Sequence, residues 1–411
     1  MNLSYSARDI LKKSVPMLNS RLSFSLLALF ISAFVYKTDI ISAGYLLVAG
    51  QLVQVFVVAS SRFFVGINIK SNPNDIKIML KNYLNILAFA IIWGIILTIL
   101  LYIVSPFYTQ DLITLKTINF LAFGIIPLSI YGCNCTVLET IQKARYVFII
   151  NIITSAINVA LIFIFYTMVN DALLSIVWSL TISRIIAAFL SILPLIKYIE
   201  YLKLNFSYFK GFISIGINES FNSIISVGLM TILIWLLSGT MIESEIAKLY
   251  LYFNILNFIQ VTAMAIVTSI TVNYINNEKK FLAISTISIF IYICFYISFS
   301  PLISWIIFSD ITYFWNVIIC VLTVLLYLLA KNISNRIRYI KNNSKIAYIS
   351  NISVGIVLLF VMLFNIHTAA NILMLFLSGE AVSFLICLFF YQRYLKKYNR
   401  KSSFNLNCSA S

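Results

Sequence analysis

Charged residues are scarce in this sequence, and their scarcity excludes a soluble protein. Asp, Glu, Lys and Arg make up 10% of the 411 residues, whereas 61% are apolar and the mean hydropathy is +0.99. A soluble core has no room for that much apolar surface, but a bilayer crossing needs about 20 mostly apolar residues. The composition therefore predicts an all-α polytopic membrane protein, and the length allows roughly a dozen crossings.

The usual signatures of catalysis and metal binding are also missing. The chain has a single histidine, His367, and its six cysteines form no CxxC pair. It contains no GxxxxGK[ST] or GxGxxG pattern for nucleotides and no HExxH pattern for zinc. We therefore expect no enzymatic activity, catalytic residue, cofactor or metal. Any transport has to draw on an ion gradient or on the gradient of the substrate itself.

Twelve apolar windows are present, six in each half of the chain. The predicted spans lie near residues 18–36, 40–67, 83–104, 117–138, 147–169, 172–193, 211–239, 246–275, 281–308, 312–330, 346–365 and 370–393. A charged stretch without an apolar run separates the first six predicted spans from the last six. The predicted domains are an N-terminal six-helix lobe (1–196), a cytoplasmic linker (197–210), a C-terminal six-helix lobe (211–395) and a cytoplasmic tail (396–411).

The distribution of Lys and Arg sets the predicted orientation. With both termini in the cytoplasm, the inside segments hold 23 Lys and Arg, whereas the outside loops hold Lys37, Lys116 and Lys248. Such an excess is typical of cytoplasmic loops, and a shift by one span would break the alternation. Acidic residues show the opposite bias. The outside loops contain Asp39, Asp111, Asp171, Glu243, Glu245 and Asp310.

Three arginines, Arg21, Arg62 and Arg184, lie within predicted spans of the N-terminal lobe. An ionised side chain near the bilayer centre is costly, so it should face a protein-lined or wet cavity. Arg21 and Arg62 lie near span ends, where snorkelling to the headgroups is an equal alternative. Arg184 lies in mid-span, where snorkelling is difficult. We therefore expect Arg184 to line a substrate or ion pathway.

Other polar residues in the spans are further candidates for this pathway. Asn218 and Asn222 share a helix face, flanked by Glu219, and they line either the space between the lobes or an interfacial turn. Glu380 lies in mid-span beside Ser378 and Gly379. It is either a proton carrier with a raised pKa or a structural partner for an arginine.

Gln51 and Gln54 lie three residues apart in the second span, so they project from one side of that helix. Hydrogen bonding between helices and contact with substrate both remain open for this pair. A proline in the fourth span, Pro127, predicts a kink there.

Several segments resemble the multidrug/oligosaccharidyl-lipid/polysaccharide (MOP) export superfamily, and within it the multidrug and toxin extrusion (MATE) family. The resemblance covers most of residues 8–395. It rests on Ser14-Val15-Pro16-Met17-Leu18, on Phe123-Gly124-Ile125-Ile126-Pro127 through Leu138-Glu139-Thr140-Ile141-Gln142-Lys143, and on Ile213-Ser214-Ile215-Gly216-Ile217. It implies a V-shaped pair of bundles that alternates access and exports amphipathic compounds in exchange for protons or sodium.

The sequence departs from the MATE pattern at the residues that couple transport to a cation. The family usually carries an aspartate deep in the first helix, where Ser32 or its neighbours stand here, and the seventh-helix acid would fall near Ser226. These departures favour a second resemblance, to a Wzx-like flippase of undecaprenyl-pyrophosphate-linked oligosaccharides. Arginine suits such a substrate because guanidinium donates two hydrogen bonds to phosphate oxygens.

We therefore predict a secondary transporter of an amphipathic drug, toxin or metabolite, with the lipid-linked sugar flippase as the alternative. A non-transporting scaffold or a surface-sugar polymerase is a third class, and the short outside loops argue against the polymerase. The expected location is a bacterial inner membrane. The expected partners are the substrate, a coupling ion and membrane lipids, with no nucleic acid, and the expected state is a monomer.

Overall fold

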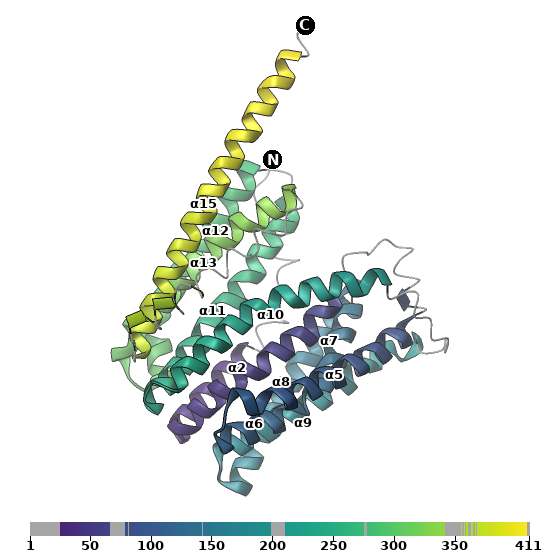
Figure 1. Cartoon of the computed structure of the whole chain (residues 1–411), viewed down its shortest axis with the longest axis vertical. Coiled ribbons are helices and arrows are strands. Elements are labelled where there is room, and N and C mark those ends of the chain that lie inside the picture. Colours follow the sequence, from purple (N-terminus) through teal and green to yellow (C-terminus); the bar gives the residue numbers. More distant parts are fainter. Residues whose placement is uncertain are drawn as a thin grey trace. The chain divides into compact units, whose positions relative to one another are not determined.

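All regular structure in the described residues is helical. The computed structural model describes residues 25–65, 79–80, 82–141, 143–198, 210–274, 278–341 and 369–408, with single positions between 355 and 368 (Figure 1). Within them, seven helices are long and apolar enough to cross a membrane, or eight if one bent pair counts as a single span. The all-α membrane fold expected from composition is thereby confirmed.

Most helices follow the predicted spans to within a few residues, but the helices Phe314–Lys341 and Ala369–Cys408 continue well past the predicted ends at 330 and 393, and the second takes in most of the predicted tail 396–411. An apolar helix at Ser25–Thr38 occupies most of the first span, and the eleventh span, 346–365, falls largely outside the described residues. The remaining elements are α2 (Ile40–Arg62), η1 (Phe63–Val65), α5 (Tyr83–Tyr108), α6 (Leu112–Ala122), α7 (Ile125–Thr140), α8 (Ala144–Val169), α9 (Ala172–Ile192), η2 (Leu193–Tyr198), α10 (Lys210–Ser238), α11 (Glu243–Tyr274), α12 (Glu278–Phe308), η4 (Ile311–Tyr313), α13 (Phe314–Lys341) and α15 (Ala369–Cys408).

The chain divides into two compact units. One unit is Val15–Asn254, and the other combines Ile255–Ser411 with Met1–Ser14. The first unit therefore extends past the predicted linker at 197–210 and includes α10 and the first turns of α11. Figure 1 shows the reason, because α10 runs alongside α2 within this unit. The division into two six-helix lobes stays a prediction.

Aspartates begin several of the helices on the side predicted to be outside. The carboxylates of Asp39, Asp111 and Asp171 accept backbone N–H bonds in the first turns of α2, α6 and α9. Asp310 does the same for η4, and the N–H of Thr312 holds the pKa of this exposed carboxyl below its usual value. These acids therefore act as N-caps, which satisfy N–H groups that a helix leaves unbonded at its start.

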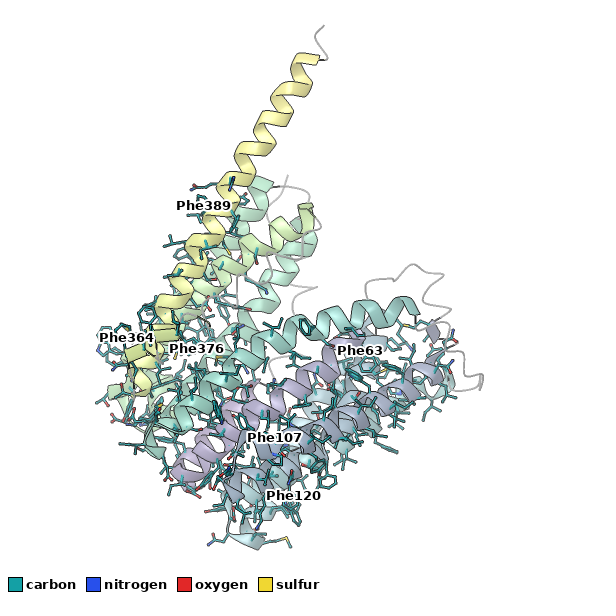
Figure 2. All side chains as sticks on the ribbon, in the orientation of Figure 1. Phe63, Phe107, Phe120, Phe364, Phe376 and Phe389 are labelled. Carbon is teal, nitrogen blue, oxygen red and sulfur yellow. The ribbon has the colours of Figure 1, made fainter. Side chains whose placement is uncertain are left out.

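The core of the first unit is apolar and aromatic. One cluster of buried side chains joins the first helix to α2, α5, α6, α8 and α9 around Leu46, Leu101 and Ile176. A second cluster surrounds Phe63, which Figure 2 labels. The Phe63 ring stacks on Phe89 with centroids 5.1 Å apart. In the other unit, α13 packs along α15. This packing restricts the conformations of the polar side chains described next, because a close-packed interior leaves few alternative rotamers.

Candidate functional site

The fourth span is broken in the middle. Helix α6 ends at Ala122, α7 begins at Ile125, and the two are bent by 42°. The predicted kink is therefore present, centred on Gly124. Pro127 stands in the first turn of α7, where the N–H that proline lacks would have no partner within the helix.

The break interrupts the backbone bonding at the end of α6, and side chains of neighbouring helices approach its last four carbonyls, of which Leu121 O also accepts from the N–H of Gly124 at 3.0 Å. Such partners are required, because a membrane interior offers little water to satisfy a backbone carbonyl. We call the four side chains around these carbonyls the carbonyl collar: Tyr102 Oη donates to Asn119 O at 3.0 Å and Arg184 Nη1 to Leu121 O at 3.4 Å. The hydroxyls of Thr181 and Thr98 donate to Val177 O and Gly94 O of their own helices at 2.9 and 2.8 Å, and also approach Phe120 O and Ala122 O at 3.4 and 3.5 Å.

Arg184 is the charged member of the collar. It is half-buried on α9, and its side chain lies against the backbone at Gly124. A Cβ added at Gly124 would lie 2.7 Å from Arg184 Cδ and 2.8 Å from Nη1, so the glycine makes the space for the guanidinium. The cation also lies at the C-terminal end of α6, where the helix dipole favours positive charge.

A buried polar seam holds the same helices together. Tyr83 donates to Asn134 Oδ1 at 2.8 Å, and Asn134 donates to Ser191 Oγ at 2.8 Å, which links α5, α7 and α9. Tyr131 bonds Asn151, and Asn158 Nδ2 donates to Ser183 Oγ at 2.7 Å, which joins α8 to its neighbours. Each asparagine here is buried. Such bonds orient helices in a membrane, where apolar contacts alone discriminate weakly.

Ser32 occupies the position where the MATE pattern would place an aspartate. Its side chain is fully buried and donates to the carbonyl of Ala28. The hydroxyl of Tyr250, on α11, lies within hydrogen-bonding reach of Ser32. The position is therefore neutral and packed in the core of the first unit, as the sequence comparison with the family pattern suggested.

Gln51 and Gln54 differ in their surroundings. Gln51 is half-buried, and its backbone carbonyl accepts a hydrogen bond from Thr231 Oγ1 of α10 at 3.1 Å, whereas Gln54 is exposed. At Gln51, the backbone carbonyl therefore makes the hydrogen bond to the neighbouring helix α10. A role of either side chain in a substrate pathway stays a prediction.

Other predicted site residues are described in part or not at all. Arg21 lies outside the described residues. Arg62 ends α2, and Asn218, Glu219 and Asn222 lie on α10, but their side chains are outside the described part of the structure. Their proposed roles stay predictions.

Glu380 is the candidate in the second unit. It lies in the middle of the span formed by the first part of α15 and is buried, with 7% of its surface exposed. Cys387 is buried on α15, seven residues after Glu380. Its thiol is acted on electrostatically by Glu380 and by Lys331 of α13. A carboxylate and an ammonium group therefore both act on one thiol at the α13–α15 interface.

Comparison with known proteins identifies the fold. A structure titled as the inward-facing conformation of a multidrug resistance MATE family transporter of the MOP superfamily matches with a TM-score of 0.75 over 96% of this chain and 99% of that chain, at 13% identity. The chain has the MATE fold. The outward-facing conformation of such a transporter matches with a TM-score of 0.70, over 95% and 96% of the two chains, also at 13% identity.

A third similar structure is described by the polarity of its binding pocket. It is a MOP superfamily transporter from Pyrococcus furiosus Vc1, described as having a binding pocket of reverse polarity that suggests a different function. Its TM-score is 0.70 at 13% identity, over 94% of this chain and 95% of that one. No protein-family model and no curated protein sequence matches the chain.

Sequence reasoning missed most of the collar. It identified Arg184 from its charge and the break from the Gly124 to Pro127 segment. Thr98, Tyr102 and Thr181 gave no signal, because hydroxyl side chains are ordinary in apolar spans and their partners come from other helices. A search for hydroxyl residues on the spans that flank a predicted break would have found them.

Proposed function

We propose that this protein is a secondary transporter that exports an amphipathic small molecule by alternating access. The MATE fold over 94 to 96% of the chain carries the proposal, because transporters with this fold have been captured in both outward-facing and inward-facing states. In the proposal, the protein lies in a bacterial inner membrane with both termini in the cytoplasm, acts as a monomer and draws on a proton or sodium gradient.

Glu380 is the proposed coupling residue. A buried carboxylate in a span is costly to ionise, so it holds a proton readily, and a lysine at the same interface offers a counter-charge when the proton leaves. Glu380 is buried on α15, and Lys331 stands on α13, which packs along α15. By contrast, the first helix offers the neutral Ser32 at the usual position of the family's aspartate.

The charge of the first unit supports a second candidate, a flippase of lipid-linked oligosaccharides. In its described membrane helices, the charged side chain in mid-span is the cation Arg184. A cation there repels a cationic drug and attracts a phosphate. The similar structure from Pyrococcus furiosus, described as having a binding pocket of reverse polarity, supports a change of pocket polarity within this fold.

Dye accumulation in cells separates the two candidates. The cells lack their own drug pumps, and a cationic dye is followed with and without this protein, with the proton gradient intact or collapsed. Export of drug-like cations predicts lower accumulation that disappears when the gradient is collapsed. Unchanged accumulation contradicts drug export, and the flippase is then tested by restoring surface polysaccharide in a strain that lacks its own flippase.

A further inference from the structure

Arg184 is held weakly for a cation in a membrane span. Within the described residues, its hydrogen bond to the protein is the single one of 3.4 Å from Nη1 to the carbonyl of Leu121. In the described part of the chain, the one salt bridge joins Lys248 to Glu245, far along the sequence from this helix. A guanidinium has five N–H groups, and an ion in a span is costly unless it is paired or hydrated. Donors of Arg184 therefore remain available for an anion.

We propose that Arg184 binds a phosphate group of an amphipathic substrate, and that this binding draws the guanidinium away from Leu121 and loosens the break in the fourth span. The inference rests on the second proposed function and deepens it, because it assigns the anion a site and gives that site a mechanical consequence. Phosphate is the favoured anion because a planar guanidinium binds two of its oxygens at once.

The other members of the collar explain why the effect is local. Tyr102, Thr181 and Thr98 approach their carbonyls with neutral hydroxyls, which attract a phosphate much less than a guanidinium does. When Arg184 turns to an anion, Leu121 loses its side-chain donor, whereas the hydroxyls near the other three carbonyls stay in place. Leu121 keeps the N–H of Gly124, at 3.0 Å. The break is thus expected to change its angle without coming apart.

Binding measurements test the site directly. The full chain is reconstituted in nanodiscs of zwitterionic lipid and titrated with a short isoprenyl pyrophosphate, with inorganic pyrophosphate and with the matching isoprenyl alcohol. The variants are Arg184→Gln and Arg184→Lys, and the control is Arg145→Gln, because Arg145 is exposed at the start of α8. Inorganic pyrophosphate and the isoprenyl probe distinguish a free phosphate from a lipid headgroup as the source.

We expect the isoprenyl pyrophosphate to bind and the alcohol to fail. In Arg184→Gln the Kd should rise roughly tenfold to a hundredfold, the range for loss of a charged hydrogen-bonded contact. Arg184→Lys should fall between Gln and wild type, and Arg145→Gln should stay within about twofold of wild type. Equal affinity of Arg184→Gln and wild type overturns the site.

A distance measurement tests the mechanical step. Spin labels at positions 112 and 139, both exposed, report the angle between α6 and α7 in a background without native cysteines. The probe should change this distance in the wild type and not in Arg184→Gln. Gly124→Ala should displace the flexible Arg184 side chain, because the added Cβ would lie 2.7 Å from its Cδ, so this variant should bind the probe more weakly than the wild type. An unchanged distance with the probe bound overturns the loosening of the break.

Failure of the inference can be told from failure of the transport function. Gradient-dependent dye export with no pyrophosphate binding would refute the Arg184 site and leave the transporter intact. Pyrophosphate binding that depends on Arg184, in a protein that exports no dye, would support the site and remove drug export.

Discussion

At the scale of single residues, Asn134 ties three helices of the first unit together. Its amide accepts from Tyr83 on α5 and donates to Ser191 on α9, and its side chain is completely buried. An amide serves here because it is both a donor and an acceptor, and the two neighbouring hydroxyls lie on opposite sides of it. An apolar residue of the same size would leave the Tyr83 hydroxyl without this acceptor, whereas the Ser191 hydroxyl would keep its bond to the carbonyl of Ala188 at 2.7 Å.

Asn134→Leu should therefore destabilise the protein by about 1 to 2 kcal/mol, because bonds between membrane helices contribute modestly and two are lost together. The measurement is the thermal unfolding midpoint of the purified protein in detergent. Ser191→Ala removes one of the two bonds and should show a smaller loss. An Asn134→Leu protein as stable as wild type would contradict the role of the seam.

The candidate site shows what single residues reveal in a sequence. Arg184 stood out because charge in an apolar window is costly whatever surrounds it. Its hydrogen-bond partner, the carbonyl of Leu121, could not be predicted, because a backbone carbonyl has no sequence signal and is accessible here through the break at Gly124. The roles of Thr98 and Thr181 were equally hidden. What a polar side chain costs can thus be read from the sequence, but which group satisfies it depends on packing between helices.

At the scale of elements, α10 and α2 form a close interface lined by small residues. Ser220 donates to the carbonyl of Ala59 at 3.1 Å, and Thr231 donates to that of Gln51 at 3.1 Å. A Cβ added at Gly216 would lie 2.5 Å from the carbonyl oxygen of Phe63. Small residues let two helices approach until hydroxyls reach the facing backbone, an arrangement common in membranes.

Gly216→Ala should therefore push α10 away from α2 and lower the unfolding midpoint, because the facing group is backbone and yields little. Gly228→Ala on the same helix is the matched control. Its added Cβ has no neighbour within 4 Å, and alanine favours helix over glycine by about 1 kcal/mol, so this variant should be neutral or slightly stabilised. Equal effects of the two substitutions would show that the close approach at Gly216 is unimportant.

Helix positions were largely predictable, whereas their grouping was not. Apolar windows and charged boundaries located α5, α8 and α9 to within a few residues, because length and hydropathy are local properties. The linker at 197–210 suggested that α10 belongs with the helices that follow it. In the structure α10 packs on α2, through contacts such as Gly216 with Phe63 that lie far apart in the sequence. Hydropathy carries no information about such contacts.

At the scale of the whole molecule, the described mid-span charges differ in sign and setting between the two units. The first unit places a cation, Arg184, at a helix break, whereas the second places a buried carboxylate, Glu380, on α15. A division of labour follows if the protein works as proposed. The first unit binds the substrate's charged group, and the second exchanges the proton that drives the cycle.

Glu380→Gln tests this division. The amide keeps the size of the carboxyl and cannot release a proton, so transport in this variant should lose its dependence on the proton gradient and on external pH. The measurement is substrate flux into proteoliposomes with and without an imposed pH gradient. Glu139→Gln is the control, because Glu139 is an exposed carboxylate at the end of α7. Flux in Glu380→Gln that still rises with the pH gradient would assign coupling to another residue. Downhill flux that no longer depends on the pH gradient would show that the substrate site is intact and that proton coupling is lost.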